Sequence, residues 1–94
     1  MINEQIVGEF IQAWSRLDAA ELVDYFAPDG TYHNMPIAPV SGRENLLAFI
    51  QNFLKSWERT DWELLNIVAQ GDLVFAERMD RTVVAGRQVE LPCV

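Results

Sequence analysis

Apolar residues in the first half of the chain recur at the three- and four-residue spacing of helices. The pattern predicts a helix over residues 3–17, a shorter second helix that opens at Asp18, and a third that opens at Ser41. Asp18 and Ser41 are each followed three positions later by a glutamate, a capping-box signature of a helix start. The expected buried positions are Ile6, Phe10, Ala13, Trp14, Leu17, Leu22, Tyr25, Phe26, Leu46, Leu47, Ile50, Phe53, Leu54 and Trp57.

The second half of the chain has the composition and alternation of β-strands. It predicts strands at about 61–69, 73–84 and 87–94, separated by turns at 70–72 and 85–86. A short strand is also expected over residues 30–35, where prolines follow. Helices followed by a strand meander predict an α+β fold, with three N-terminal helices packed on one face of a curved, mostly antiparallel sheet. We expect a single domain over residues 1–94.

Charge and composition restrict the partners. The net charge is −7 and the basic residues are scattered, so neither nucleic acid nor an anionic membrane is an expected partner. No apolar run approaches the length of a membrane span, and the first residues lack the pattern of a signal peptide, so we expect a cytoplasmic protein. The single cysteine, Cys93, fits a reducing compartment. Because the one histidine and one cysteine lack ligand spacing, we expect no metal and no other cofactor.

Two pairs of polar residues are the candidate chemistry. Arg78 and Asp80 are two apart on one predicted strand, and Tyr32 and Asn34 are two apart on another, so each pair shares a face. The spacing of Arg78 and Asp80 alone favours a structural salt bridge, and Tyr32 and Asn34 alone favour a core residue and a turn residue. Together the pairs indicate a polar-lined pocket, in which a phenol and a carboxamide can hold a water molecule.

Two stretches resemble a known family. Tyr32-His33-Asn34-Met35-Pro36, with Pro39-Val40-Ser41-Gly42-Arg43 after it, resembles the signature of the limonene-1,2-epoxide hydrolase family. Glu77-Arg78-Met79-Asp80, followed by Gly86-Arg87-Gln88-Val89-Glu90-Leu91-Pro92, resembles that family's arginine–aspartate strand and the hairpin after it. The resemblance implies the nuclear transport factor 2-like cone, a homodimer or higher oligomer through the sheet, and a one-step, metal-free opening of an epoxide by water to a diol.

The resemblance also implies roles for the four polar residues. Tyr32 and Asn34 match the pair that positions the water, Asp80 matches the general acid, and Arg78 matches the residue that bridges two aspartates. The expected substrate is a small apolar epoxide or another hydrophobic small molecule. Candidate apolar pocket residues are Met35, Ile37, Val40, Leu46 and Ile50.

The family's second aspartate, the base, matches no position in this sequence. The resemblance places it on a strand after Val94, so we expect a C-terminally truncated domain whose last strands are missing. Two carboxylates around one guanidinium sum to −1 and can retain a proton, whereas one carboxylate and one guanidinium sum to zero. The chain alone is therefore expected to be weak or inactive as an enzyme.

Two other functions stay open. The chain can be a non-catalytic ligand-binding or oligomerisation module of the same cone fold, with an exposed strand edge that Pro92 only partly blunts. It can also be a relative of the ketosteroid isomerases or polyketide cyclases with Asp80 as a lone base, a role for which the adjacent Arg78 is poorly suited. His33 is expected to face away from Tyr32 and Asn34, at the surface or in an interface.

Overall fold

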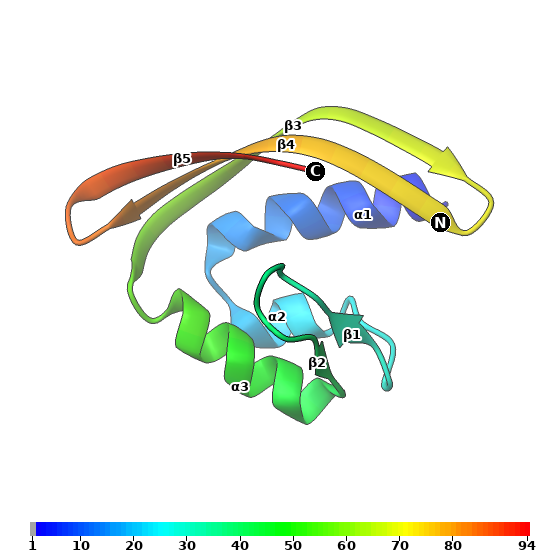
Figure 1. The fold of residues 1–94 in the computed structure, drawn as a ribbon, viewed down its shortest axis with the longest axis horizontal. Coiled ribbons are helices and arrows are strands. Elements are labelled where there is room, and N and C mark those ends of the chain that lie inside the picture. The colour runs from blue at the N-terminus through cyan, green and yellow to red at the C-terminus, as the bar shows by residue number, and fades with distance from the viewer. Residues whose placement is uncertain (1) are drawn as a thin grey trace.

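A computed structural model describes residues 2–94 as a layer of helices under an arched sheet (Figure 1). The helical elements are α1 (Asn3–Ala13), the 3-10 turn η1 (Trp14–Arg16), α2 (Ala19–Val23) and α3 (Arg43–Leu54). The strands are β1 (Thr31–Tyr32), β2 (Val40–Ser41), β3 (Trp57–Gln70), β4 (Leu73–Val84) and β5 (Arg87–Cys93). Antiparallel strands β3, β4 and β5 form the larger sheet, and β1 pairs with β2 in a separate ribbon. All three helices lie on the concave side of the larger sheet, which confirms the predicted α+β architecture.

The first helix ends earlier than predicted, and the second lacks part of its predicted cap. The helix predicted over residues 3–17 ends as an α-helix at Ala13, tightens into η1, and stops at Leu17, whose φ of 52° lets the chain reverse. Asp18 caps α2 as predicted, because its Oδ1 accepts a hydrogen bond from the Glu21 amide at 3.2 Å. The Glu21 side chain pairs with Arg16 at 2.8 Å, so it does not complete a capping box.

The predicted capping residue of the third helix is wrong by one position. α3 begins at Arg43, after Gly42 as N-cap with a φ of 85° and no side-chain cap. Ser41 belongs to β2, where its Oγ lies 2.8 Å from Thr31 Oγ1 across the ribbon. Because the Ser41 hydroxyl pairs across this ribbon, it does not cap α3 as the sequence pattern predicted. Trp57, expected on the helix, is the first residue of β3.

The strand predictions hold best for the long strands. β4 spans the predicted residues 73–84, whereas β3 begins four residues earlier than expected and β1 is only two residues long. Ala85 and Gly86 both have positive φ, 51° and 76°, which suits the two-residue turn of a β-hairpin. This turn fixes the register of β5 on β4, from Val84 opposite Arg87 to Arg78 opposite Cys93.

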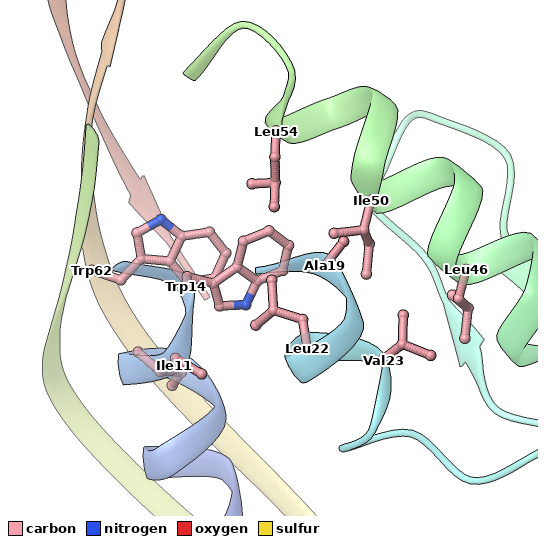
Figure 2. Close-up of a cluster of buried hydrophobic side chains, with 10 residues drawn as sticks. Ile11, Trp14, Ala19, Leu22, Val23, Leu46, Ile50, Leu54 and Trp62 are labelled. Atoms are coloured by element: carbon pink, nitrogen blue, oxygen red, sulfur yellow. The ribbon is translucent and has the colours of Figure 1, made fainter. Parts of the chain in front are cut away.

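The core lies between the helices and the concave face of the sheet. Trp14 is fully buried at its centre and stacks on Trp62 of β3, with ring centroids 4.3 Å apart and an interplanar angle of 17°. Figure 2 shows this stack beside Leu22 of α2 and the apolar stripe of α3. The buried apolar residues are Ile11, Ala13, Trp14, Ala19, Leu22, Val23, Leu46, Ile50, Leu54 and Trp62.

Replacement of Ile50 by alanine tests this core. Ile50 is 0% exposed, whereas Ile37 is 45% exposed, so the same substitution at the two positions separates burial from side-chain chemistry. We expect Ile50→Ala to lower the free energy of unfolding by about 2–5 kcal/mol and Ile37→Ala by less than about 1 kcal/mol. Urea unfolding followed by tryptophan fluorescence measures both, and equal losses would contradict the assigned core.

Candidate functional site

Arg78 and Asp80 project from β4 into the concave side of the sheet and form an ion pair. Arg78 Nε donates to Asp80 Oδ1 at 2.8 Å, and Asp80 is 7% exposed. Trp62, opposite Asp80 on β3, lies against the guanidinium, with Arg78 Cζ 4.2 Å from the indole centroid. A cation over an indole face is attracted by the ring quadrupole, most strongly where water is excluded. The guanidinium is therefore held both at its edge and on its face.

Cys93 is a member of this cluster that the motif analysis missed. It pairs with Arg78 in the β4–β5 ladder, and its Sγ lies 3.4 Å from Asp80 Oδ2, in the position of a hydrogen-bond donor. The other acceptor within reach, the Leu91 carbonyl, is farther at 3.6 Å. Each carboxylate oxygen of Asp80 thus accepts one hydrogen bond within the cluster. The sequence could have predicted this position of Cys93. If residues 85–86 form a two-residue turn, antiparallel pairing from Val84 opposite Arg87 places Cys93 opposite Arg78.

A pocket of about 380 Å³ opens between the chain that follows β1 and the β4–β5 pair. Its lining residues are Tyr32, His33, Asn34, Met35, Arg78, Cys93 and Val94. The structure thus brings three of the four polar candidates to one pocket. Asp80 is the exception, because it lies behind Arg78 and Cys93 and is not a lining residue.

Residues 33–35 line the pocket from a loop after β1, and not from the strand predicted over residues 30–35. β1 ends at Tyr32, and Asn34 closes a turn in which its carbonyl accepts from the Ile37 amide at 2.8 Å. Because β1 ends at Tyr32, the alternation of a strand does not extend to His33 and Asn34. As a result His33, expected on the opposite face, lines the same pocket as its two neighbours.

The five apolar pocket candidates divide between surface, core and pocket. Met35 lines the pocket and is 76% exposed, and Ile37 is exposed outside the lining. Val40 is partly buried against the core from β2. Leu46 and Ile50 are fully buried in the core under α3 and do not belong to the pocket lining, because the stripe of α3 faces α2 and the tryptophans.

Burial keeps two ionisable groups of the cluster neutral. It raises the pKa of the Tyr32 phenol, an effect that the nearby Arg78 opposes and Asp80 reinforces. Burial also raises the pKa of the Cys93 thiol, and the charge and hydrogen bond of Asp80 add to this shift. At neutral pH Cys93 is therefore a hydrogen-bond donor and a poor nucleophile.

Within residues 2–94 no three His, Cys, Asp or Glu side chains are grouped as a metal site. None of the helices in this range is both long and apolar enough to cross a membrane. Of the residues that line the pocket, none is an aspartate or glutamate.

Three helices under a curved antiparallel sheet, with a polar pocket at its concave side, define the nuclear transport factor 2-like fold. Within this fold, the chain belongs to the SnoaL-like domain family, whose model matches residues 7–94. The chain is also similar to several solved structures.

One is an epoxide hydrolase of M. tuberculosis described as LEH-like, with a TM-score of 0.80 and 18% identity over 95% of this chain and 66% of that one. A second is a hypothetical protein of Catenulispora acidiphila with a ketosteroid isomerase-like fold, solved with trimethylamine, with a TM-score of 0.85 and 24% identity over 97% and 72%. A third is a putative SnoaL-like polyketide cyclase of Shewanella denitrificans, with a TM-score of 0.75 and 18% identity over 94% and 71%. At these identities the similarity establishes the fold.

The ionisation of Cys93 tests the geometry of the cluster. We expect the rate of alkylation by iodoacetamide to rise with pH with a midpoint above 9.0, the ordinary pKa of the thiol. Asp80→Asn should lower that midpoint, because it removes the neighbouring negative charge. The folded chain holds this proton more tightly than the unfolded chain, so the group's contribution to stability is lost as the pH rises through this range. A midpoint at or below 9.0 in the wild-type chain would contradict the burial of the thiol, and an unchanged midpoint in Asp80→Asn would contradict the Cys93–Asp80 contact.

Proposed function

We propose that the chain carries the water site and the arginine–aspartate pair of an epoxide hydrolase of the limonene-1,2-epoxide type. The observation that carries the proposal is a pocket lined by Tyr32, Asn34 and Arg78, with Asp80 held directly behind Arg78 at an Nε–Oδ1 distance of 2.8 Å. The two sequence stretches that resemble this family supply these same four residues. The fold shared with the M. tuberculosis LEH-like epoxide hydrolase also supports it.

The proposed reaction places a water molecule between Tyr32 and Asn34. The water oxygen attacks a ring carbon, the carbon–oxygen bond opens, and the ring oxygen takes up a proton while the water loses one. Positioned acids and bases accelerate such proton transfers by about 10²–10⁴-fold each. Asp80 is the one carboxylate of the cluster, and it is neutralised by Arg78. We therefore propose slow turnover by this chain, for lack of a second carboxylate to accept the proton from water.

A second carboxylate introduced at Cys93 tests this proposal. Cys93→Asp places a carboxylate in the pocket lining, beside Asp80 and opposite Arg78 in the ladder. Two carboxylates around one guanidinium can share a proton, which supplies an acid and a base together. We expect the rate of diol formation from small apolar epoxides to rise at least tenfold, with ¹⁸O from labelled water in the diol.

Cys93→Asn is the matched control, because it has nearly the same shape and no charge. It should leave the rate at the wild-type level, and near-ultraviolet circular dichroism should show that all three proteins keep the same tryptophan environment. If neither the wild-type chain nor folded Cys93→Asp forms labelled diol from a panel of epoxides, the hydrolase assignment is wrong.

A second candidate is a non-catalytic ligand-binding module of the same fold. The occupation of both Asp80 oxygens, by Arg78 Nε and by the Cys93 thiol, favours it, because a carboxylate so held lies behind the pocket wall. The same observation disfavours Asp80 as the lone base of an isomerase or cyclase. For a binding module we expect an epoxide and its unreactive cyclic ether analogue to bind with equal affinity, with no turnover by wild type or by Cys93→Asp. Equilibrium dialysis with both compounds measures this.

A further inference from the structure

The outer edge of β3 is open along the last part of the strand. Among residues 2–94, β3 has β4 on one side and no strand on the other (Figure 1). Residues 66–70, which we call the open edge, pair regularly with β4 and follow the bulge at Leu65. Val68 is 62% exposed, and Asn66 and Gln70 are exposed as well. An unpaired edge of this kind offers a row of backbone N–H and C=O groups to another strand.

The backbone groups that face outward along the open edge are those of Ile67 and Ala69. Gln70 pairs with Leu73 across a two-residue turn, and such a turn closes on a hydrogen-bonded pair. Hydrogen-bonded and non-hydrogen-bonded pairs alternate along an antiparallel ladder, so Ile67 and Ala69 form non-hydrogen-bonded pairs with β4. The other hairpin, closed by the turn at 85–86, gives the same alternation along β4. The N–H and C=O groups of Ile67 and Ala69 therefore point away from β4.

The open edge lacks the features that keep edge strands from pairing. Natural edge strands are blunted by charged side chains, by proline or by a bulge. The segment Asn66-Ile67-Val68-Ala69-Gln70 contains no charged residue, no proline and no glycine. The bulge at Leu65 lies before this segment and not within it. The charged residues of β3 all precede the bulge, at Glu58, Arg59, Asp61 and Glu63.

The open edge is also complementary to a second copy of itself. In an antiparallel pair of two copies with Val68 on the two-fold axis, Asn66 of each copy lies opposite Gln70 of the other, and Ile67 lies opposite Ala69. The outward backbone groups of Ile67 and Ala69 then meet each other. Asn66 Nδ2 is bonded to Glu77 Oε1 at 2.8 Å, so its Oδ1 is the atom that accepts from the Gln70 carboxamide of the second copy.

Other registers match less well. A register must keep the same face of both sheets on the same side, so it shifts in steps that preserve the alternation of side chains. Centring the pair on Ile67 places Asn66 opposite Val68, and centring it on Ala69 places Gln70 opposite Val68. Each of these sets a carboxamide against an apolar side chain. The register centred on Val68 matches polar with polar and apolar with apolar.

We propose that two copies of the chain associate through the open edge of β3, in the register centred on Val68, so that their sheets join into one antiparallel sheet. The two-fold arrangement uses this edge of each copy once, so it closes at a dimer. The contact is smaller than the about 800 Å² per partner of a standard interface, so we expect a weak, reversible dimer. The proposal names a strand and a register, which the resemblance to a family does not, and it is independent of the proposed function.

A cysteine on the two-fold axis tests the strand and the register together. In a Cys93→Ser background, Val68→Cys places two thiols opposite each other in a non-hydrogen-bonded pair, the kind in which side chains are closer. We expect mild oxidation to convert most of this protein into a disulfide-linked dimer on non-reducing electrophoresis. Phe75→Cys is the matched control, because Phe75 lies opposite Val68 on β4 and is 57% exposed, yet it is not at the edge. It should stay largely monomeric.

Sedimentation equilibrium measures the association without a cross-link. Wild type should show a concentration-dependent equilibrium of monomer and dimer. Val68→Lys should weaken the dimer about tenfold, because it replaces an apolar pair on the axis by two like charges. Ile67→Pro should weaken it as well, since it removes an outward N–H that β4 does not use. Phe75→Lys adds the same charge to the same face of the sheet and should leave the dimer within twofold of wild type. Circular dichroism checks that each variant is folded.

Every outcome of these experiments bears on the proposal. A wild-type chain that stays monomeric at the highest concentration reached overturns it, and so does a dimer that both Val68→Lys and Ile67→Pro leave unchanged. Loss of the dimer in Phe75→Lys alone also overturns it, because the contact then lies on the face of the sheet. Cross-linking of Phe75→Cys as complete as that of Val68→Cys contradicts the register.

Discussion

The stack of Trp14 on Trp62 joins the helical layer to the sheet, and the pocket depends on it as much as the core does. Trp14 ends the first helix at η1 and is fully buried, and Trp62 of β3 meets it with a centroid distance of 4.3 Å. The indole of Trp62 also lies against the guanidinium of Arg78 at 4.2 Å. A continuous series of contacts therefore runs from the first helix to the charged group of the pocket, and then to Asp80 and Cys93.

This arrangement leaves two indole N–H groups buried without partners in the described chain, a cost in stability that the burial of the two rings outweighs. The indole nitrogens of Trp14 and Trp62 are both buried without a hydrogen-bond partner among the described residues. An unsatisfied buried donor costs about 1–3 kcal/mol. A buried tryptophan removes about 150–250 Å² from water, which stabilises by about 4–6 kcal/mol at 25 cal/mol per Å². Two large rings in contact are thus favourable at this position, even with both N–H groups unpaired.

The fold limits how far function follows from family. The chain belongs to the SnoaL-like domain family, and structures of similar shape include an epoxide hydrolase, a hypothetical protein with a ketosteroid isomerase-like fold and a putative polyketide cyclase. One architecture thus accompanies several chemistries, so the pocket side chains must carry the functional argument. Here they offer neutral donors and one arginine, with the carboxylate placed behind it. That arrangement explains why one added carboxylate is a decisive experiment.

Local periodicity in the sequence determined which residues share a face, and the structure agrees for the long elements. Arg78 and Asp80 are on the same side of β4 because alternate residues of a strand always are. The turn at 85–86 likewise determined that Cys93 would lie opposite Arg78, although Cys93 is part of neither polar pair.

Tertiary structure decided which residues each face contacts. The apolar stripe of α3 meets the core and not the pocket, Ser41 pairs across a ribbon and does not cap a helix, and Asp80 lies behind Arg78. Periodicity predicts that a side chain is buried, whereas the residues that this side chain contacts depend on the curvature of the sheet and the packing of distant segments.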